Sequence, residues 1–289
     1  MENLTSCPLC RDSEIVVTDA ECRLFMCCSC NLVFDNPRPA LEEIRSYYSR
    51  PNQYDDWLAK GKERESLWRR RLAMVLRYAT PGSLMDVGAG IGQFLALARP
   101  HFNSVIGTEI SATAALIAAD KFGIEVLTGT VDEIDFSGRM VQNLTLFHVL
   151  EHVPEPLALI RKAHSLLTPE GILFIAVPNE IFSLRNMVRR CLNRLGVSRI
   201  SYRGKLGIPP ITLDGSLAEI HLSHFSPGVL EKILAKEGFT LLESGLDPYY
   251  AESGVRLVVN SFYFAACRMI YMVTGRNIYE TIWIVAKKQ

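Results

Sequence analysis

Short apolar runs alternate with amphipathic segments of helical period from residue 83 onward. The runs at 83–87, 104–107, 124–127, 144–147 and 172–177 have the length and composition of buried strands. Helical patterns begin at Phe94, Ala112, Pro156 and Gly228, and two further strand-like runs cover 239–244 and 281–286. Strands that alternate with helices predict an open, mostly parallel sheet with helices on both faces, the doubly wound α/β class.

The first of these strands leads into a glycine-rich turn, Asp86-Val87-Gly88-Ala89-Gly90-Ile91-Gly92. Glycine allows a sharp turn and lets a ligand approach the backbone, and ligands bind at the carboxyl ends of the strands in such sheets. The spacing is G-x-G-x-G, whereas dinucleotide-binding folds carry G-x-G-x-x-G. Glu109 ends the second strand, where a carboxylate can accept hydrogen bonds from both ribose hydroxyls. This spacing, together with Asp86, favours S-adenosylmethionine over NAD.

Four motifs in this order resemble those of class I S-adenosylmethionine-dependent methyltransferases. They are the glycine turn, Glu109-Ile110-Ser111, the segment 147–153 and the segment 167–171 before the fifth strand; the resemblance covers 81–178 and resumes at His221. It implies a seven-stranded Rossmann-like sheet in the order 3-2-1-4-5-7-6, with the last strand antiparallel. Thr130 stands where many relatives carry an acid that holds the adenine, so the adenine contact is expected from a backbone group or from Asp132. The cofactor-binding residues expected from the residues and the resemblance together are Asp86, Gly88, Ala89, Gly90, Gly92, Glu109, Ile110, Val131, Asp132 and Phe147.

Six of the eight cysteines lie within the first thirty residues. Cys7 and Cys10 form one C-x-x-C pair and Cys27 and Cys30 form another, which is the spacing of a two-knuckle zinc site. Each pair supplies half of a tetrahedron of thiolates, and the spacing favours Cys27 over Cys28 as a ligand. The segment resembles the zinc-binding module found ahead of methyltransferase domains in sugar and polysaccharide biosynthesis. We expect the metal to be structural, because so small a ribbon has little core of its own.

These patterns predict three parts. Residues 1–38 form the zinc ribbon, residues 39–80 a helical connector or cap, and residues 81–289 the methyltransferase domain. The stretch 41–79 is expected to be helical and to pack over the cofactor entrance. Within the methyltransferase domain we expect a lid insertion at about 179–220 and an apolar helical segment at about 254–273 that forms a second lid or an interfacial helix.

Three polar side chains follow the fourth strand: His148, Glu151 and His152. His148 could be a general base, the three could bind a divalent metal as in the ubiquinone-pathway O-methyltransferases that the segment resembles, or Glu151 and His152 could fix the turn. The expected acceptor is a hydroxyl, or a carbon next to a carbonyl, of a sugar or related biosynthetic intermediate. An acceptor of such high pKa needs a base, and His148, His221 and His224 are the candidates.

The predicted insertion combines an apolar stripe with arginines. Ile181, Leu184, Val188, Leu192 and Leu195 share helical spacing, and Arg185, Arg189 and Arg190 flank them. Such a helix could lie on a membrane surface, grip a diphosphate, or pack against the core. The first two possibilities favour an anionic acceptor, either a nucleotide-linked or a lipid-linked sugar.

The charge balance changes the choice of acceptor class. Lysine plus arginine equals aspartate plus glutamate, 31 each, so no global field attracts nucleic acid. This balance counts against one alternative to methyl transfer to a small molecule, an RNA base methyltransferase with a zinc ribbon. The other alternative is a non-catalytic binding protein. No uncharged apolar stretch reaches eighteen residues, so we expect no transmembrane helix. The N-terminus lacks a signal pattern, which favours a cytoplasmic protein with peripheral contact to the inner membrane surface as an option.

Overall fold

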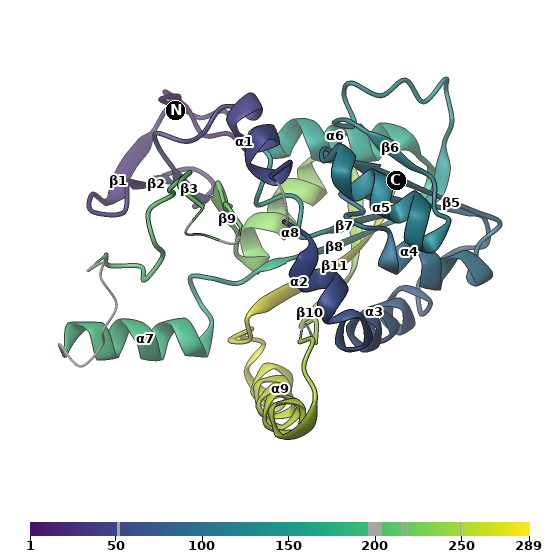
Figure 1. The fold of residues 1–289 in the computed structure, drawn as a ribbon. Coiled ribbons are helices and arrows are strands. Elements are labelled where there is room, and N and C mark those ends of the chain that lie inside the picture. The colour runs from purple at the N-terminus through teal and green to yellow at the C-terminus, as the bar shows by residue number, and fades with distance from the viewer. Residues whose placement is uncertain (51–52, 196–203, 216, 218, 249) are drawn as a thin grey trace.

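The computed structural model describes residues 1–50, 53–195, 204–215, 217, 219–248 and 250–289 (Figure 1). Its central sheet has seven strands in the order β10-β11-β8-β7-β4-β5-β6. In chain order these strands are β4 Ser83–Val87, β5 Ser104–Glu109, β6 Val126–Thr128, β7 Val141–Phe147, β8 Leu167–Pro178, β10 Phe239–Gly245 and β11 Thr281–Lys288. β11 pairs antiparallel with β8 and β10, and the other neighbours run parallel. The predicted fold class, strand order and antiparallel last strand are confirmed.

Helices cover both faces of this sheet (Figure 1). They are α4 Gln93–Ala98, the 3-10 helix Arg99–His101, α5 Ala112–Phe122, α6 Pro156–Leu166 and α8 Pro227–Lys236. In β8, Leu173 and Ile175 pack with α6 and α8, whereas Phe174 and Ala176 pack with α4 and the connector. Because both faces are buried, the strand is apolar without alternation, as its sequence indicates.

The connector is divided into three helices, whereas the sequence predicts continuous helix over 41–79. They are α1 Leu41–Tyr48, α2 Asp55–Ala59 and α3 Gly61–Val75. α1 ends before Ser49, and the sequence places a proline two residues further on, which disfavours helix at the residue before it. Leu72 and Val75 of α3 join the core on the α4 side of the sheet, so the connector is part of the methyltransferase fold.

The ribbon is a four-stranded sheet, β1-β2-β3-β9. Its strands are β1 Ile15–Asp19, β2 Leu24–Cys27, β3 Val33–Asp35 and β9 Ser223–His224. The last of these, β9, comes from the segment that precedes α8, where Ser223 pairs with Phe34 and His224 with Val33. The expected division at residue 38 is therefore bridged by a shared sheet.

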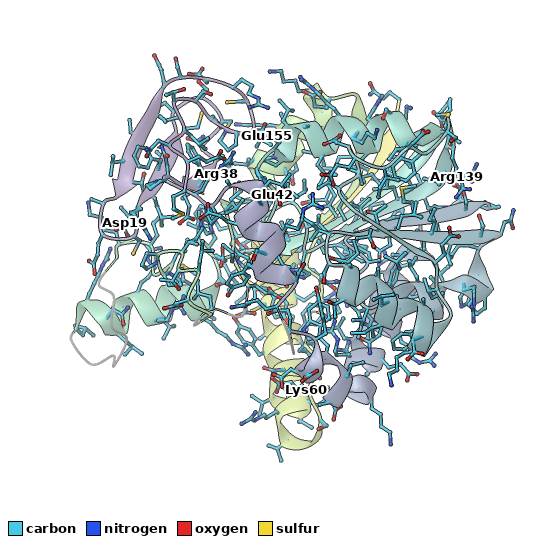
Figure 2. All side chains as sticks on the ribbon, turned by 45° about the horizontal axis from the view of Figure 1, so that its top comes forward. Asp19, Arg38, Glu42, Lys60, Arg139 and Glu155 are labelled. Atoms are coloured by element: carbon cyan, nitrogen blue, oxygen red, sulfur yellow. The ribbon has the colours of Figure 1, made fainter. Side chains whose placement is uncertain are left out.

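A buried arginine also joins the ribbon to the rest of the molecule. Arg38 is 1% exposed and forms ion pairs with Glu2 at 3.1 Å and with Glu155, at the start of α6, at 3.6 Å. Figure 2 shows Arg38 and Glu155 between the ribbon and the sheet. A buried charge is tolerated where it is paired, so this contact fixes the ribbon against α6.

Two helices lie at the edge of the molecule, below the sheet in Figure 1: α7 Leu184–Arg194 and α9 Gly254–Thr274. In the described part of the chain, α9 alone is long and apolar enough to cross a membrane by length and composition, and only 6% of its apolar window is buried. The sequence leads us to expect no transmembrane helix, and that expectation stays a prediction, because α9 meets this test by length and composition only. Residues 196–203, 216 and 218 of the predicted insertion lie outside the described residues.

Candidate active site

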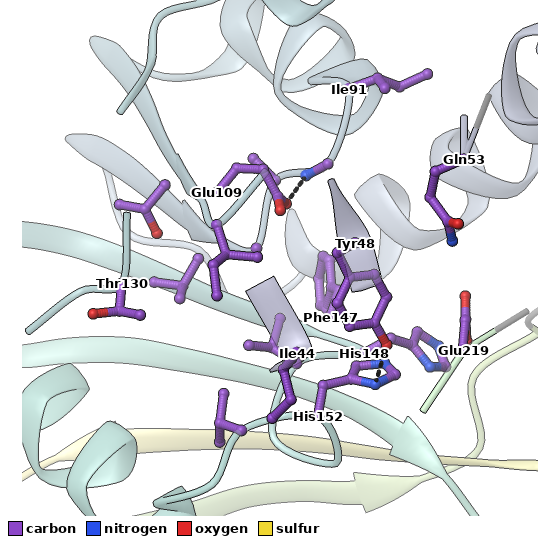
Figure 3. A pocket seen from close by; sticks show the side chains of 18 of the residues that line it. Ile44, Tyr48, Gln53, Ile91, Glu109, Thr130, Phe147, His148, His152 and Glu219 are labelled. Atoms are coloured by element: carbon purple, nitrogen blue, oxygen red, sulfur yellow. Dashed lines mark hydrogen bonds between the residues drawn. The ribbon is translucent and has the colours of Figure 1, made fainter. Parts of the chain in front are cut away.

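A cavity of about 1010 Å³ lies beyond the carboxyl ends of β4, β5 and β7 (Figure 3). Residues of α1, α2 and α3, among them Tyr48, Trp57 and Arg64, form part of its wall. The cavity is also lined by most of the predicted cofactor-binding residues: Asp86, Gly88, Ala89, Gly90, Glu109, Ile110, Val131, Asp132 and Phe147. The tertiary structure therefore gathers them at one place, where ligands of open α/β sheets bind.

The glycine turn has the close contacts that its sequence predicts. A Cβ on Gly88 would lie 2.5 Å from Val149 Cγ2, and one on Gly90 would lie 2.9 Å from Trp57 Cζ3. Both residues have positive φ, 73° and 53°, which only glycine adopts without strain. Gly92, by contrast, does not line the cavity. A Cβ there would meet Ala118 at 2.9 Å, so Gly92 serves the packing of α4 against α5.

Glu109 is held at the end of β5 by two backbone amides. Its Oε2 accepts from Gly90 N at 2.9 Å and its Oε1 from Ser111 N at 3.0 Å, and Figure 3 shows the first of these bonds. Burial raises the pKa of the carboxyl, and the amides of Ser111 and Gly90 oppose that rise. Each oxygen keeps lone-pair capacity, so the geometry can accept further hydrogen bonds from ribose hydroxyls.

Asp86 is a second buried carboxyl on the cavity wall. Thr145 Oγ1 donates to its Oδ1 at 2.6 Å. Burial raises the pKa of Asp86 to about 7, against the lowering effects of Thr145 and Arg71. A cation that enters the cavity would favour ionised Asp86, because an opposite charge nearby stabilises the charged form.

His148 lies at the carboxyl end of β7 with its ring nitrogens held from two sides. Its backbone has positive φ, 56°, and its amide donates to Ala176 O at 2.8 Å. The Nδ1 atom lies 3.2 Å from Glu151 Oε1, and Arg71 Nη2 lies 3.2 Å from Nε2. If Nδ1–H donates to Glu151, Nε2 carries the lone pair and accepts from Arg71. Glu151 therefore fixes the orientation of the His148 ring, while Arg71 occupies the Nε2 lone pair that a base would use.

A second histidine, which the sequence offered only as a turn or metal residue, belongs to the cavity wall. His152 Nδ1 lies 2.6 Å from Ile220 O and 3.0 Å from Tyr48 OH (Figure 3). Burial lowers the pKa of His152, so it is neutral at neutral pH. Tyr48 and Glu219 also line the cavity, and no motif in the sequence indicates them as site residues; the sequence predicts only that the connector, which contains Tyr48, packs over the cofactor entrance.

His221 and His224 do not line the cavity, and both are held by carboxylates. His221 Nδ1 lies 2.8 Å from Glu180 Oε1, while His224 contacts Glu180 through Nδ1 and lies 3.0 Å from Asp35 Oδ2 through Nε2. Burial opposes protonation, but Glu180 and Asp35 raise the pKa of His224 to about 9. Burial likewise opposes the rise in the pKa of His221, which Glu180 raises well above its usual value. Both rings are cations at neutral pH, so the structure does not support them as bases.

The residues that could bind a metal differ from the predicted group. Glu151, His152 and His221 place ligand atoms within 4.8 Å of one another. His148 is not part of this group, although the sequence suggested it. The ring centroids of His152 and His221 are 4.8 Å apart, and Glu180 engages His221. Glu151 Oε1 lies 3.8 Å from His152 Nε2, and metal binding by Glu151, His152 and His221 stays a prediction.

The four predicted zinc ligands meet at one point of the ribbon. Cys7, Cys10, Cys27 and Cys30 place their sulfurs within 4.8 Å of one another, with Cys7 Sγ 3.6 Å from Cys30 Sγ and Cys10 Sγ 3.4 Å from Cys27 Sγ. A tetrahedron with Zn–S bonds of about 2.3 Å has edges of about 3.8 Å. The arrangement fits zinc, while Cys28 is exposed and outside the group.

A family model described as "Methyltransferase domain" matches residues 61–244, which is more than half of the chain. Curated relatives include the ubiquinone biosynthesis O-methyltransferases of Xanthomonas campestris pv. campestris strains B100 and 8004. Each is 33% identical over an alignment of 116 residues, with 36% of this chain and 46% of the relative covered. The chain thus matches less than half the length of these relatives.

Solved structures share the fold at low identity. Magnesium protoporphyrin IX methyltransferase from Synechocystis PCC 6803, with bound SAH, has a TM-score of 0.54 at 14% identity and covers 86% of this chain and 100% of its own. A possible histamine N-methyltransferase from Thermotoga maritima has a TM-score of 0.53 at 17% identity, with 85% and 100% covered. These likenesses concern the fold of the sheet and its helices.

Proposed function

The chain belongs to the methyltransferase-domain family, and from that premise we propose that it methylates a hydroxyl group of a small biosynthetic intermediate, such as a sugar derivative. It is an S-adenosylmethionine-dependent methyltransferase. The O-methyltransferase relatives, 33% identical over 116 residues, support a hydroxyl over a carbon as the acceptor. The resemblance of the ribbon to modules of sugar biosynthesis supports the sugar.

The observation that carries this proposal is the oriented imidazole of His148 on the cavity wall. S-adenosylmethionine supplies a methyl carbon whose bond to sulfur breaks, with the electron pair left on sulfur, as the acceptor oxygen attacks. His148 Nε2 takes the hydroxyl proton, and Glu151, 3.2 Å from Nδ1, stabilises the imidazolium that forms. Arg71 Nη2 must yield its place at Nε2 to the acceptor. Alignment of donor and acceptor supplies most of the remaining rate enhancement.

The cofactor residues divide into four roles in this proposal. Glu109 accepts from the ribose hydroxyls, the backbone of Gly88 and Gly90 lies along the amino-acid half of the donor, and Asp132 or the backbone beside it holds the adenine. All four line the cavity. Asp86 balances the positive charge of the donor.

The arginines of α7 do not support the predicted diphosphate grip. None of Arg185, Arg189 and Arg190 lines the main cavity. Arg185 pairs with Glu280 at 3.4 Å and Arg189 donates to Gly207 O at 2.6 Å. An anionic acceptor is therefore proposed on the resemblance to sugar enzymes alone.

We further propose one structural zinc in the ribbon. The support is the approach of the four sulfurs described above, together with the two-knuckle spacing. Cys7, Cys10, Cys27 and Cys30 would hold the ion as thiolates and fix the turns of the ribbon. None of these four cysteines lines the cavity.

A methyl-transfer assay with labelled donor tests the function. The panel holds sugar nucleotides, lipid-linked sugars, small phenols and RNA. Label in a base-stable methyl ether of a sugar or phenol is the expected result. Label only in RNA, or an ester or amine product, would overturn the hydroxyl proposal. Calorimetry with S-adenosylmethionine on the same protein shows that the donor site is intact.

A further inference from the structure

α9 presents an apolar stripe to solvent along its whole length. Val255, Val258, Val259, Phe262, Met269 and Val273 recur at helical spacing and are between 53% and 86% exposed. Nothing among the described residues covers this stripe. Contiguous exposed apolar surface on this scale marks an interaction site.

The opposite side of α9 is fixed to the protein. Cys267 is 1% exposed and packs with Leu246 and Tyr279. Tyr263 OH donates to Glu280 Oε1 at 2.8 Å, and Tyr271 OH donates to Ser244 O. Figure 1 shows α9 along the edge of the molecule beneath β10. One face of the helix therefore contacts the fold through Tyr263, Cys267 and Tyr271, and the apolar stripe lies on the face turned to solvent.

The fold prevents α9 from crossing a bilayer, although its length and composition would allow it. Residues 246–253 join β10 to α9, and residues 275–280 join α9 to β11. Fully extended, the residue steps from Gly245 to Gly254 reach about 30–32 Å and those from Thr274 to Thr281 about 23–25 Å. A hydrocarbon core is about 30 Å thick, and β10 and β11 pair at Gly245 and Trp283. A crossing helix would draw one of these links almost fully extended through the hydrocarbon with its backbone polar groups unpaired, which lipid does not allow, so α9 lies flat.

Charge identifies the kind of surface that this stripe fits. α7 and α9 contain no aspartate or glutamate, although the chain as a whole is balanced at 31 each. They carry six arginines, Arg185, Arg189, Arg190, Arg194, Arg256 and Arg268. Arg185 Nη2 donates to Asn260 Oδ1 at 2.6 Å and so holds the two helices together. A second copy of this chain would bring arginine against arginine, whereas anionic lipid headgroups would complement it.

We propose that α9, flanked by the basic helix α7, docks the protein peripherally on an anionic membrane, with its exposed stripe in the headgroup and acyl boundary. An amphipathic helix with basic flanks binds such an interface in its plane. Two neighbouring cavities adjoin this surface and the candidate active site. Arg64 lines both the main cavity and a smaller one of about 220 Å³, which Arg185 and Asn260 of the two helices also line.

Vesicle co-sedimentation of the full chain tests the docking. Wild type is expected to sediment with vesicles of phosphatidylcholine mixed with phosphatidylglycerol, and not with phosphatidylcholine alone. The double variant Val259→Asp/Phe262→Asp should lower the partition coefficient at least tenfold. Arg256→Gln/Arg268→Gln should lower it several-fold and weaken its salt dependence. Leu116→Asp is the matched control, because Leu116 is 71% exposed on α5, and it should bind as wild type does.

Donor binding by calorimetry and the thermal midpoint show whether each variant is folded. Absence of wild-type binding to anionic vesicles would overturn the proposal, as would equal binding by the double variant and the Leu116 control. Sedimentation that survives carbonate extraction would overturn the flat placement. A dimer in solution that the double variant converts to monomer, without vesicle binding, would assign the stripe to a second copy instead. None of these outcomes depends on the acceptor, so failure of the docking leaves the proposed reaction standing.

Discussion

Removal of the Glu109 carboxylate tests the cofactor site most directly. In Glu109→Ala, two ribose hydroxyls lose their acceptor, which for hydrogen bonds to a charged group weakens binding by about 1.5–3 kcal/mol. That loss corresponds to a dissociation constant raised about 10- to 150-fold. S-adenosylmethionine and S-adenosylhomocysteine should be affected alike, because the ribose is common to both.

The structure adds a second consequence of this change. Glu109 also accepts from Gly90 N and Ser111 N, and a buried donor left unpaired costs about 1–3 kcal/mol. The alanine variant should therefore have a lower thermal midpoint. Glu109→Gln keeps one carbonyl oxygen but turns an NH₂ toward one of the amides, so an intermediate loss is expected.

Titration calorimetry measures the affinities, and thermal unfolding followed by circular dichroism shows whether the fold survives. Glu125→Ala is the control, because Glu125 is exposed and does not line the cavity. Its affinity should match wild type. If Glu109→Ala folds and binds both ligands with wild-type affinity, Glu109 does not contact the ribose and the cofactor placement is refuted.

Three further predictions follow from the same geometry. Elemental analysis should find one zinc per chain, which Cys27→Ser should lose and Cys28→Ser should keep; the opposite result would reverse the ligand choice. His148→Gln should reduce turnover far more than donor affinity. If this variant instead keeps the turnover of wild type, His152 becomes the candidate base, and His152→Gln is the variant to compare. Asp86 has its pKa raised to about 7 by burial, so its contribution to stability in the free protein falls as pH rises from the unfolded value through about 7. A bound cation offsets the cost of ionising Asp86. The affinity for S-adenosylmethionine should therefore rise between about pH 6 and 8, and binding below this range should release a proton. If the Asp86→Asn variant shows the same pH profile as wild type, Asp86 is not the titrating group.

The ribbon and the sheet are bound into one unit by contacts that no local pattern reveals. Ser223 and His224 complete the ribbon sheet, and His224 lies between Asp35 and Glu180, which come from β3 and the end of β8. Removal of one partner of a buried ion pair leaves an uncompensated charge. The four-cysteine ribbon is therefore coupled to the residues that follow β8, beside the cavity.

Local periodicity and spacing determined the sheet, the glycine turn and the four thiolates. A buried strand needs an unbroken apolar run, a tight turn needs glycine, and two knuckles need cysteines three residues apart, so each feature is visible within a few residues of sequence. The positions of Asp86, Gly88, Gly90 and Glu109 on the cavity wall follow from strand ends that meet at one edge of the sheet.

The tertiary structure alone decided which histidines could accept a proton and which helix faces stay in water. His152 meets Tyr48, which lies 104 residues away in sequence, and His224 meets Asp35 across 189 residues. Burial and opposing charges then set the protonation of each ring, and both depend on neighbours that only the folded chain brings together. For the stripe of α7 the sequence leaves a membrane surface, a diphosphate and core packing open, and for α9 it predicts a second lid or an interfacial helix. The fold leaves the stripe of α9 exposed because links of six and eight residues bind this helix to the sheet by its other face.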